Sequence, residues 1–285
     1  MNKNQHHRDK NKKTAAENKR IVLSGQYTIG DKTVKLRHSL EEHQSVIVLD
    51  PLRVEQITDE LRKQKFLLGS DQESNPKSLY DDCVIKVIDA DSFRYPNALV
   101  MNFANAKYPG GGYRSGAHAQ EECLCLQSTL YASLSSERAG EMYEHNTIVN
   151  APFDSDYMLI SPVVEVFRNS DESLKEDPFT TAVITLPAPN RNGRARFKSD
   201  EEVRVLFEHR IRNMLYCAAF HNYETLTLGA WGCGSFGNDP RTVAEAFRKV
   251  LVDENLRRFF KRIDFAIPRG AGNDNYKVFR DVLEN

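Results

Sequence analysis

The chain has 285 residues, of which 40% are hydrophobic and 28% are charged, so it is long enough to bury a substantial core. Lysine and arginine number 39 and aspartate and glutamate number 40, which leaves no excess of positive charge to attract nucleic acid or an anionic membrane. We therefore expect neither sequence-specific nucleic-acid binding nor membrane attachment. An anionic ligand would have to be held by local geometry.

The N-terminal residues 1–13, MNKNQHHRDKNKK, are polar and basic, and no apolar segment follows them. This composition is typical of a disordered tail rather than of a secretory signal or a membrane anchor. The five cysteines form no C-x-x-C pair, and most lie in apolar runs, where a free thiol behaves as a small hydrophobe. A reducing, cytoplasmic setting follows as the expectation.

After the tail, the sequence predicts a helix that opens with Thr14 as its cap, has Glu17 three residues later as in a capping box, and ends near Gly25. Residues 14–80 as a whole are interpreted as an accessory α/β extension. Its other predicted parts are strands over residues 32–37 and 45–50, a helix over residues 51–66, and a polar connection over residues 69–78.

Residues 81–285 show the pattern of the main domain. Short runs rich in Val, Ile and Leu predict strands over residues 83–90, 98–105, 158–168, 181–189, 225–231 and 263–268. Amphipathic patterns between them predict helices over residues 120–134, 201–222 and 240–260. Apolar strands that alternate with helices indicate an α/β fold with a mainly parallel sheet covered on both faces. Ligands of such sheets bind beyond the carboxyl ends of the strands, where both glycine-rich stretches of this chain fall.

The second of these stretches, GCGSFG from Gly232 to Gly237, formally matches the dinucleotide fingerprint and lies between a strand and the helix that Pro240 begins. A dehydrogenase is disfavoured, because that fingerprint opens its fold and the acidic residues at the right distance, Asp253 and Glu254, lie inside a helical pattern. The sequence favours a phosphate-binding loop of another nucleotide-binding fold. A purely structural tight turn is the alternative.

The first stretch is NFANAKYPGGGYRSGAHAQEE, with a glycine triplet and then Glu121 and Glu122 at the predicted start of a helix. Three glycines suggest a backbone that a ligand approaches closely. A carboxylic acid beside a sugar is the usual device for protonating a leaving hydroxyl and stabilising an oxocarbenium-like centre. Neighbouring helical residues project about 100° apart, so we expect one glutamate to carry the chemistry and the other to position the substrate. The alternative is that Glu121 and Glu122 only form a favourable acidic first turn of the helix and have no functional role.

Gly110, Gly111 and Gly112, followed after seven residues by QEE, resemble the signature of poly(ADP-ribose) glycohydrolases of the microbial type. The resemblance continues in SPVVEVFR from Ser161, in LPAPN, and in GAWGCGSFGND from Gly229, so it covers most of the chain. It implies a macrodomain-like three-layer α/β/α sandwich with a mixed, mainly parallel sheet. It also implies two ligand loops that grip ADP-ribose.

The resemblance also implies roles for individual residues. Glu122 falls on the catalytic acid and Glu121 on the residue that contacts the ribose at the scissile bond. The first glycine loop fits around that sugar and the neighbouring phosphates, and Phe236 in the second loop stacks on the ligand. The ligand-binding residues implied in this way are Asn105, Gly110, Gly111, Gly112, Gln120, Gly232, Gly234, Ser235, Phe236 and Gly237.

The expected activity is hydrolysis of the ribose–ribose bond of poly(ADP-ribose) by a monomer, with ADP-ribose as product and ADP-ribosylated protein as a further substrate. No metal and no redox cofactor are expected, because no histidines or carboxylates show metal-ligand spacing. Two alternatives remain open, namely an ADP-ribose reader without turnover and a hydrolase of single ADP-ribose units. A carboxylate beside an anionic ligand argues against the reader.

Other residues near the glutamates have weaker functional interpretations. His118 is expected to be an exposed loop histidine rather than a proton carrier. Arg114 either meets a phosphate of the polymer or faces solvent. The positions Cys123, Leu126, Leu130 and Leu134 recur at helical spacing and are predicted to be core.

Overall fold

The computed structural model describes residues 3–67, 80–270 and 274–284. The predicted polar connection over residues 69–78 lies outside this part. The chain divides into two compact units, which we describe separately. The first consists of Met1–Val48, Phe93–Asp154 and Leu159–Pro187, and the second of Leu49–Ser92, Ser155–Met158 and Ala188–Asn285.

The sheet of the first unit contains three long apolar strands. Strand β5 (Leu99–Ala104) is parallel to β7 (Leu174–Pro187), and β7 is antiparallel to β6 (Met158–Arg168). All residues of β5 except Phe103 are buried, which agrees with its nearly continuous apolar sequence. Along the chain, the division between the two units falls within the short strand β3 (Ile47–Leu49).

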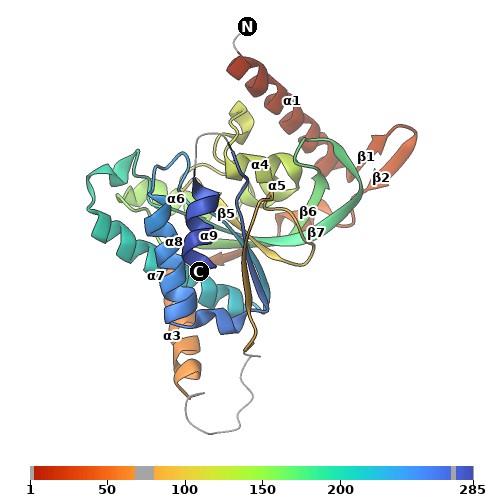
Figure 1. Cartoon of the computed structure of the whole chain (residues 1–285). Coiled ribbons are helices and arrows are strands. Elements are labelled where there is room, and N and C mark those ends of the chain that lie inside the picture. The colour runs from red at the N-terminus through yellow and green to blue at the C-terminus, as the bar shows by residue number, and fades with distance from the viewer. Residues whose placement is uncertain (1–2, 68–79, 271–273, 285) are drawn as a thin grey trace. The chain divides into compact units, whose positions relative to one another are not determined.

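The N-terminal part of the first unit consists of helix α1 (Lys3–Ser24), the hairpin β1 (Gln26–Ile29) and β2 (Lys32–Lys35), and helix α2 (Leu40–Gln44). Figure 1 shows α1 and the hairpin beside β6 and β7. Phe167 of β6 packs there in a buried cluster with Ile21, Tyr27, Val34 and Leu36. This small apolar core attaches the hairpin to the sheet.

Helix α1 corrects the prediction for the N-terminus. It begins at Lys3, whereas the sequence predicted a disordered tail over residues 1–13 and a helix cap at Thr14. Thr14 instead donates a hydrogen bond to Glu172, and Glu17 pairs with Arg168. Of the described side chains before Thr14, only that of Asn11 is buried, and it contacts loop carbonyls, so no apolar periodicity revealed the helix.

The segment between β5 and β6 is helical. Its elements are η1 (Tyr113–Ser115), α4 (Gln120–Gln127), α5 (Leu130–Leu134) and α6 (Gly140–Val149). The predicted single helix over residues 120–134 is wrong, because Ser128 pairs with Val166 of β6 and separates α4 from α5. The predicted core positions Leu126, Leu130 and Leu134 are buried, whereas Cys123 is half-buried.

The second unit has three parallel strands, with β9 (Arg262–Ala266) between β4 (Val84–Ile88) and β8 (Thr225–Leu228). Phe265 of β9 packs against Phe247 and Phe279 of the covering helices. The helical elements of this unit are α3 (Pro51–Leu67), η2 (Arg194–Phe197), α7 (Asp200–Phe220), α8 (Pro240–Arg248), a π-helical turn (Lys249–Asp253), η4 (Leu256–Phe259) and α9 (Asn275–Leu283).

Three of the strand pairs are parallel and the β6–β7 pair is antiparallel, which confirms the predicted α/β class with a mixed, mainly parallel sheet. Six predicted strands of the main domain correspond to β4, β5, β6, β7, β8 and β9. Within the described residues, no helix is both long enough and apolar enough to cross a membrane.

Candidate active site

The two predicted catalytic glutamates lie in the first turn of α4, in the first unit. The chain leaves β5, passes through the glycine triplet and η1, and enters α4 at Gln120. The exposed fraction is 3% for Glu121 and 7% for Glu122, although carboxylates are rarely buried without partners. Their burial therefore requires hydrogen bonds from the surrounding backbone.

Glu122 is held by two backbone N–H groups. Its Oε1 accepts the N–H of Gly112 at 2.7 Å, and its Oε2 accepts the N–H of Ala119 at 2.8 Å. The second bond resembles half of a capping box, because Glu122 is at the third position of the helix and reaches back to the cap residue. Ala119 at the cap has no side-chain oxygen with which to reciprocate. The carboxylate of Glu122 is thus fixed between the glycine loop and the helix start.

Glu121 has a different set of partners. Its Oε2 accepts the N–H of Asn105 at 2.8 Å, and its Oε1 accepts a hydrogen bond from the Asn102 amide at 3.2 Å. Burial raises the pKa of Glu121 to about 8, against the opposing effect of the Asn105 N–H. Glu121 therefore binds a proton at neutral pH much more readily than an ordinary carboxyl group does.

Asn102 in β5 suits this neutral form of Glu121. Its amide nitrogen lies 3.2 Å from Oγ1 of Thr185 as well as from Glu121. Its Oδ1 is buried and has no hydrogen-bond partner among the described residues. With the amide turned over, Oδ1 would accept the proton of a neutral Glu121. Asn102 can therefore serve either protonation state of that carboxyl group.

Each glycine of the triplet has its own steric reason. A Cβ on Gly111 would lie 2.5 Å from Oε1 of Glu122 and 2.9 Å from Oε2 of Glu121, so both carboxylates converge on this residue. A Cβ on Gly110 would lie 2.8 Å from the ring of Tyr131. Gly110 and Gly111 also have positive φ angles, of 66° and 56°. The triplet is thus required by the packing of the loop as well as by any ligand.

The third glycine and the predicted ligand residues Gln120 and Asn105 also have structural contacts. A Cβ on Gly112 would lie 2.6 Å from that of Ala117. The Gln120 amide accepts the Phe103 N–H and donates to the Met101 carbonyl, so it ties α4 to β5. Oδ1 of Asn105 accepts the N–H groups of the two turn residues Lys107 and Tyr108.

Helix α1 donates hydrogen bonds to the segment that contains α4 and the loop before it. Asn11 donates to the carbonyls of Gly116 and Ala117 in the loop before α4. Asn18 donates to the carbonyls of Cys125 and Leu126 near the end of α4, at 3.4 and 2.8 Å. Both asparagines are 2% exposed and lie seven residues apart, on one side of α1. They hold both ends of the helix that carries the glutamates.

The second glycine loop belongs to the second unit and follows β8. Gly232 and Gly237 have φ angles of 74° and 70°. A Cβ on Gly232 would lie 2.6 Å from the Asn238 amide, and one on Gly237 would lie 2.7 Å from that of Asn192. A Cβ on Gly234 would meet nothing within 4 Å. The space beside Gly234 is open, as close approach of a ligand requires.

Two asparagines support this loop. Asn238 donates to the carbonyls of Pro189 and Gly232, and Asn192 donates to the carbonyl of Ser235. The carbonyl of Phe236 accepts the N–H of Asn192, and the Phe236 side chain is half-buried. Helix α8 then begins at Pro240 as predicted. The loop is therefore a defined shape with an accessible aromatic side chain.

The structure brings together Asn105, Gly110, Gly111, Gly112, Gln120, Glu121 and Glu122 in the first unit. Gly232, Gly234, Ser235, Phe236 and Gly237 form the loop of the second unit. His118 is exposed, as expected. A lone asparagine carries no pattern in a sequence, so the supporting residues could not be predicted; these are Asn11, Asn18, Asn102, Asn192 and Asn238.

A model of the family "Microbial-type PARG, catalytic domain" matches residues 15–169, more than half of the chain. PARG denotes poly(ADP-ribose) glycohydrolase. The chain belongs to this family. It is therefore a hydrolase of the glycosidase class. The match begins within α1 and ends just after β6, so it contains the glycine triplet and both glutamates.

Solved PARG structures extend the similarity to nearly the whole chain. The PARG of Thermomonospora curvata is 30% identical with a TM-score of 0.85, over 96% of this chain and 100% of that one. Its complex with the inhibitor ADP-HPD gives a TM-score of 0.83 at 30% identity, over 96% of this chain and 99% of that one.

The PARG of Deinococcus radiodurans in complex with ADP-ribose is also 30% identical, with a TM-score of 0.75, over 88% of this chain and 98% of that one. No curated protein matches the chain significantly. At 96% of this chain, the similarity to the Thermomonospora curvata structure extends over both units.

Proposed function

We propose that this PARG-family chain hydrolyses the O-glycosidic ribose–ribose bond of poly(ADP-ribose), releases ADP-ribose, and uses Glu122 as the general acid. The observation that carries the proposal is the position of Glu122. Two backbone N–H groups fix its carboxyl group beside the glycine triplet, where a Cβ on Gly111 would lie 2.5 Å from its Oε1. A positioned carboxylic acid contributes about 10²–10⁴-fold to such a reaction.

In this mechanism Glu122 gives its proton to the oxygen that leaves with the neighbouring ribose. The C–O bond breaks as the anomeric carbon acquires oxocarbenium character, and water then attacks that carbon. The hydrogen bonds from Gly112 and Ala119 hold the carboxyl group in place during the transfer. After the reaction a proton from the attacking water restores the acid.

Glu121 has the positioning role, in contact with the ribose at the scissile bond. Its hydrogen bonds to Asn102 and Asn105 hold it rigidly, which suits a residue that orients a sugar hydroxyl. Its raised pKa also makes it a rival for the role of the acid. The pH dependence of the rate distinguishes the two, because only loss of the true acid removes the basic limb of the profile.

The glycine loops would supply the binding site for ADP-ribose. Gly110, Gly111 and Gly112 would surround the terminal ribose together with Asn105 and Gln120. Gly232, Gly234, Ser235 and Gly237 would approach the diphosphate, and Phe236 would stack on the nucleotide. The complexes of the relatives with ADP-ribose and with ADP-HPD support this assignment, as does the open space beside Gly234.

The direct test is to incubate defined poly(ADP-ribose) with the purified protein and to resolve the products by chromatography. We expect shortening of the polymer with ADP-ribose as the product. Binding without any release of ADP-ribose would support a reader. Release from singly modified protein, with the polymer left intact, would support a hydrolase of single units.

We also propose that the protein acts as a monomer in a reducing, cytoplasmic setting. Its five cysteines are free thiols, and burial raises the pKa of the Cys83 thiol to about 11 and of the Cys217 thiol to about 12, so both are protected from oxidation. Light scattering of the purified protein tests the monomer, and a mass near twice that of the chain would contradict it.

A further inference from the structure

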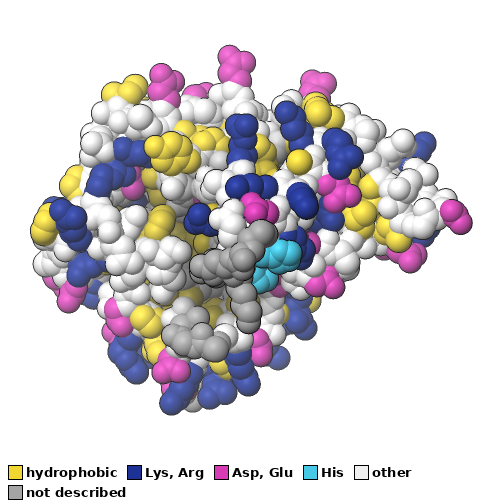
Figure 2. All heavy atoms as spheres, turned by 90° about the horizontal axis from the view of Figure 1, so that it is seen from above, with side chains coloured by type: hydrophobic (Ala, Val, Ile, Leu, Met, Phe, Trp, Pro, Cys, Tyr) yellow, Lys and Arg dark blue, Asp and Glu magenta, His cyan; other side chains and the backbone are white. Residues whose placement is uncertain are grey.

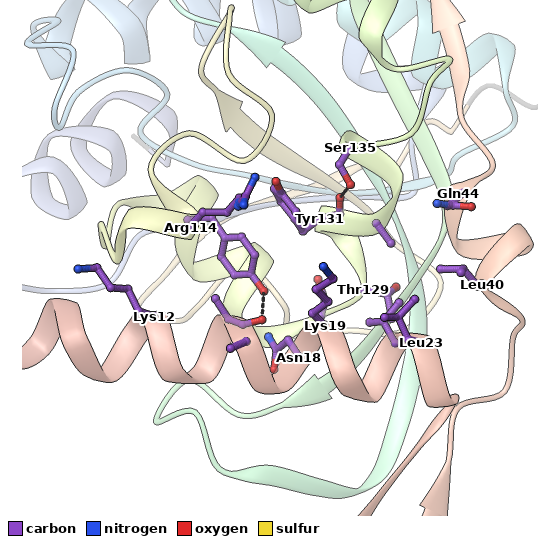
Figure 3. Close-up of a pocket in the computed structure, with 16 residues that line it drawn as sticks. Lys12, Asn18, Lys19, Leu23, Leu40, Gln44, Arg114, Thr129, Tyr131 and Ser135 are labelled. Atoms are coloured by element: carbon purple, nitrogen blue, oxygen red, sulfur yellow. Dashed lines mark hydrogen bonds between the residues drawn. The ribbon is translucent and has the colours of Figure 1, made fainter.

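A cavity lies in the first unit, between α1 and the helices that follow the glycine triplet. Its volume is about 490 Å³, which is within the range of about 300–1,000 Å³ found for small-molecule sites. Figure 3 shows residues of α1 on one side of it and Arg114, Tyr131 and Ser135 on the other. This cavity contains none of the residues assigned above to ADP-ribose binding.

The charges around the cavity have one sign. Lys12, Lys19 and Arg114 line it, and its lining includes no aspartate or glutamate. Within the described part of the chain, neither Lys19 nor Arg114 forms an ion pair, and Lys12 pairs only with exposed Asp9 at 3.5 Å. On the face of the molecule that Figure 2 shows, Lys and Arg side chains are interspersed with Asp and Glu, so the single sign is a property of the cavity lining. An anionic ligand therefore suits this cavity.

The cavity also has an apolar end. Figure 3 places Leu23 and Leu40 away from Lys12 and Arg114, with Tyr131 between the two groups. Leu23 is 61% exposed, so its side chain is accessible to a ligand in the cavity. A ligand with a flat apolar ring at one end and phosphate at the other matches this arrangement. An anionic nucleotide has that chemistry.

Part of the cavity lining directly follows the glycine triplet along the chain. Tyr113 and Arg114, which line it, directly follow Gly112, whose N–H binds the Glu122 carboxylate. The ring of Tyr131, also in the lining, fills the space beside Gly110. Arg114 comes two residues after Gly112, and two residues of chain span at most about 7 Å. The backbone positions of Gly112 and Arg114 are therefore closer together than the two ends of one ADP-ribose unit.

We infer that this cavity binds the next ADP-ribose unit of the polymer, on the leaving side of the scissile bond, with its diphosphate against Lys19 and Arg114. The inference rests on the proposed function, because it assumes that Glu122 protonates the oxygen of that leaving unit. It gives α1 a contact with the polymer in addition to its hydrogen bonds to the segment around α4. Recognition of a polymer rather than a single unit follows from this second contact.

The test compares Lys19→Glu and Arg114→Glu with Lys13→Glu, an exposed residue of α1 that does not line the cavity. For poly(ADP-ribose), we expect KM to rise by about tenfold or more in the first two variants, as loss of a charge-assisted contact implies, and to stay unchanged in the control. Inhibition by free ADP-ribose should be the same in all three. An ADP-ribosyl substrate with a small aryl leaving group should be hydrolysed equally by all.

A parent protein that leaves the polymer intact refutes the proposed function itself. An active parent whose Lys19→Glu and Arg114→Glu variants keep the parental KM, with unchanged melting temperatures, refutes the cavity alone.

Discussion

Both glycine loops of this chain contain closely spaced glycines, but the steric environments of these glycines differ. In the first, a Cβ on Gly111 would strike the carboxyl groups of Glu121 and Glu122, so the glycine makes room for the protein's own acidic groups. In the second, the space beside Gly234 is empty. A glycine required by internal packing and one that has open space beside it therefore look alike in sequence, and the difference between them is visible only in the structure.

This contrast predicts unequal effects of the same substitution. Gly111→Ala should lower hydrolysis by about 10²-fold or more, because the new methyl group displaces both carboxyl groups. Gly234→Ala should leave the melting temperature unchanged and weaken only the binding of ADP-ribose. Rates, affinities and melting temperatures of both variants check this. Full activity in Gly111→Ala would show that the carboxyl groups tolerate displacement.

The buried carboxyl group of Glu121, in the first turn of α4, predicts that the free energy of unfolding depends on pH. The unfolded chain loses the Glu121 proton near the ordinary value of 4.5, whereas the folded chain keeps it up to about 8. Unfolding then releases a proton between these pH values, so the free energy of unfolding falls as pH rises through them, by up to a few kcal/mol.

Denaturant unfolding of the parent and of Glu121→Gln at several pH values measures this effect. The glutamine cannot ionise, so the decline between pH 4.5 and about 8 should be smaller in the variant. Equal declines in both proteins would mean that Glu121 is ionised in the folded state at neutral pH.

The second loop is tested by Phe236→Ala. Base–aromatic stacking contributes about 1–3 kcal/mol, so affinity for ADP-ribose should fall by roughly ten- to a hundredfold. The carbonyl of Phe236, which accepts the Asn192 N–H, is unaffected by truncation of the side chain. If the variant instead loses melting temperature and keeps its affinity, Phe236 anchors the loop and does not contact the ligand.

The smallest effect is expected for the brace at the end of α4. Asn18→Ala removes the donor to the Cys125 and Leu126 carbonyls and also the acceptor of the Arg168 Nε–H. A buried group left without its partner costs about 1–3 kcal/mol, so the free energy of unfolding should fall by that amount. We expect kcat to fall only severalfold with KM for polymer unchanged. A kcat equal to that of the parent would confine Asn18 to stability.

The sequence predicted the elements whose buried sides are apolar. Strand β6 occupies the predicted residues 158–168, and α8 begins at the predicted Pro240. The glycine triplet and the spaced glutamates led to the family that the comparisons confirm. In these places local propensity and tertiary packing favour the same structure.

Elsewhere, polar contacts determined the structure and left no periodic pattern. The early turns of α1 bury Asn11 against loop carbonyls, so the helix begins at Lys3 although the composition of residues 1–13 is that of a tail. The break between α4 and α5 depends on a pairing of Ser128 with Val166, which is distant in sequence. The raised pKa of Glu121 depends on burial, which a pair of glutamates in a sequence does not show.

The most direct test of the account is the kinetics of Glu122→Gln, with Glu141→Gln of the exposed first turn of α6 as the matched control. The glutamine keeps the size of the side chain but cannot supply the proton. We predict that hydrolysis of poly(ADP-ribose) falls by about 10²–10⁴-fold in Glu122→Gln while affinity for ADP-ribose stays within severalfold of the parent. The control should match the parent in both. A Glu122→Gln protein that hydrolyses the polymer as fast as the parent would contradict the assignment of Glu122 as the acid.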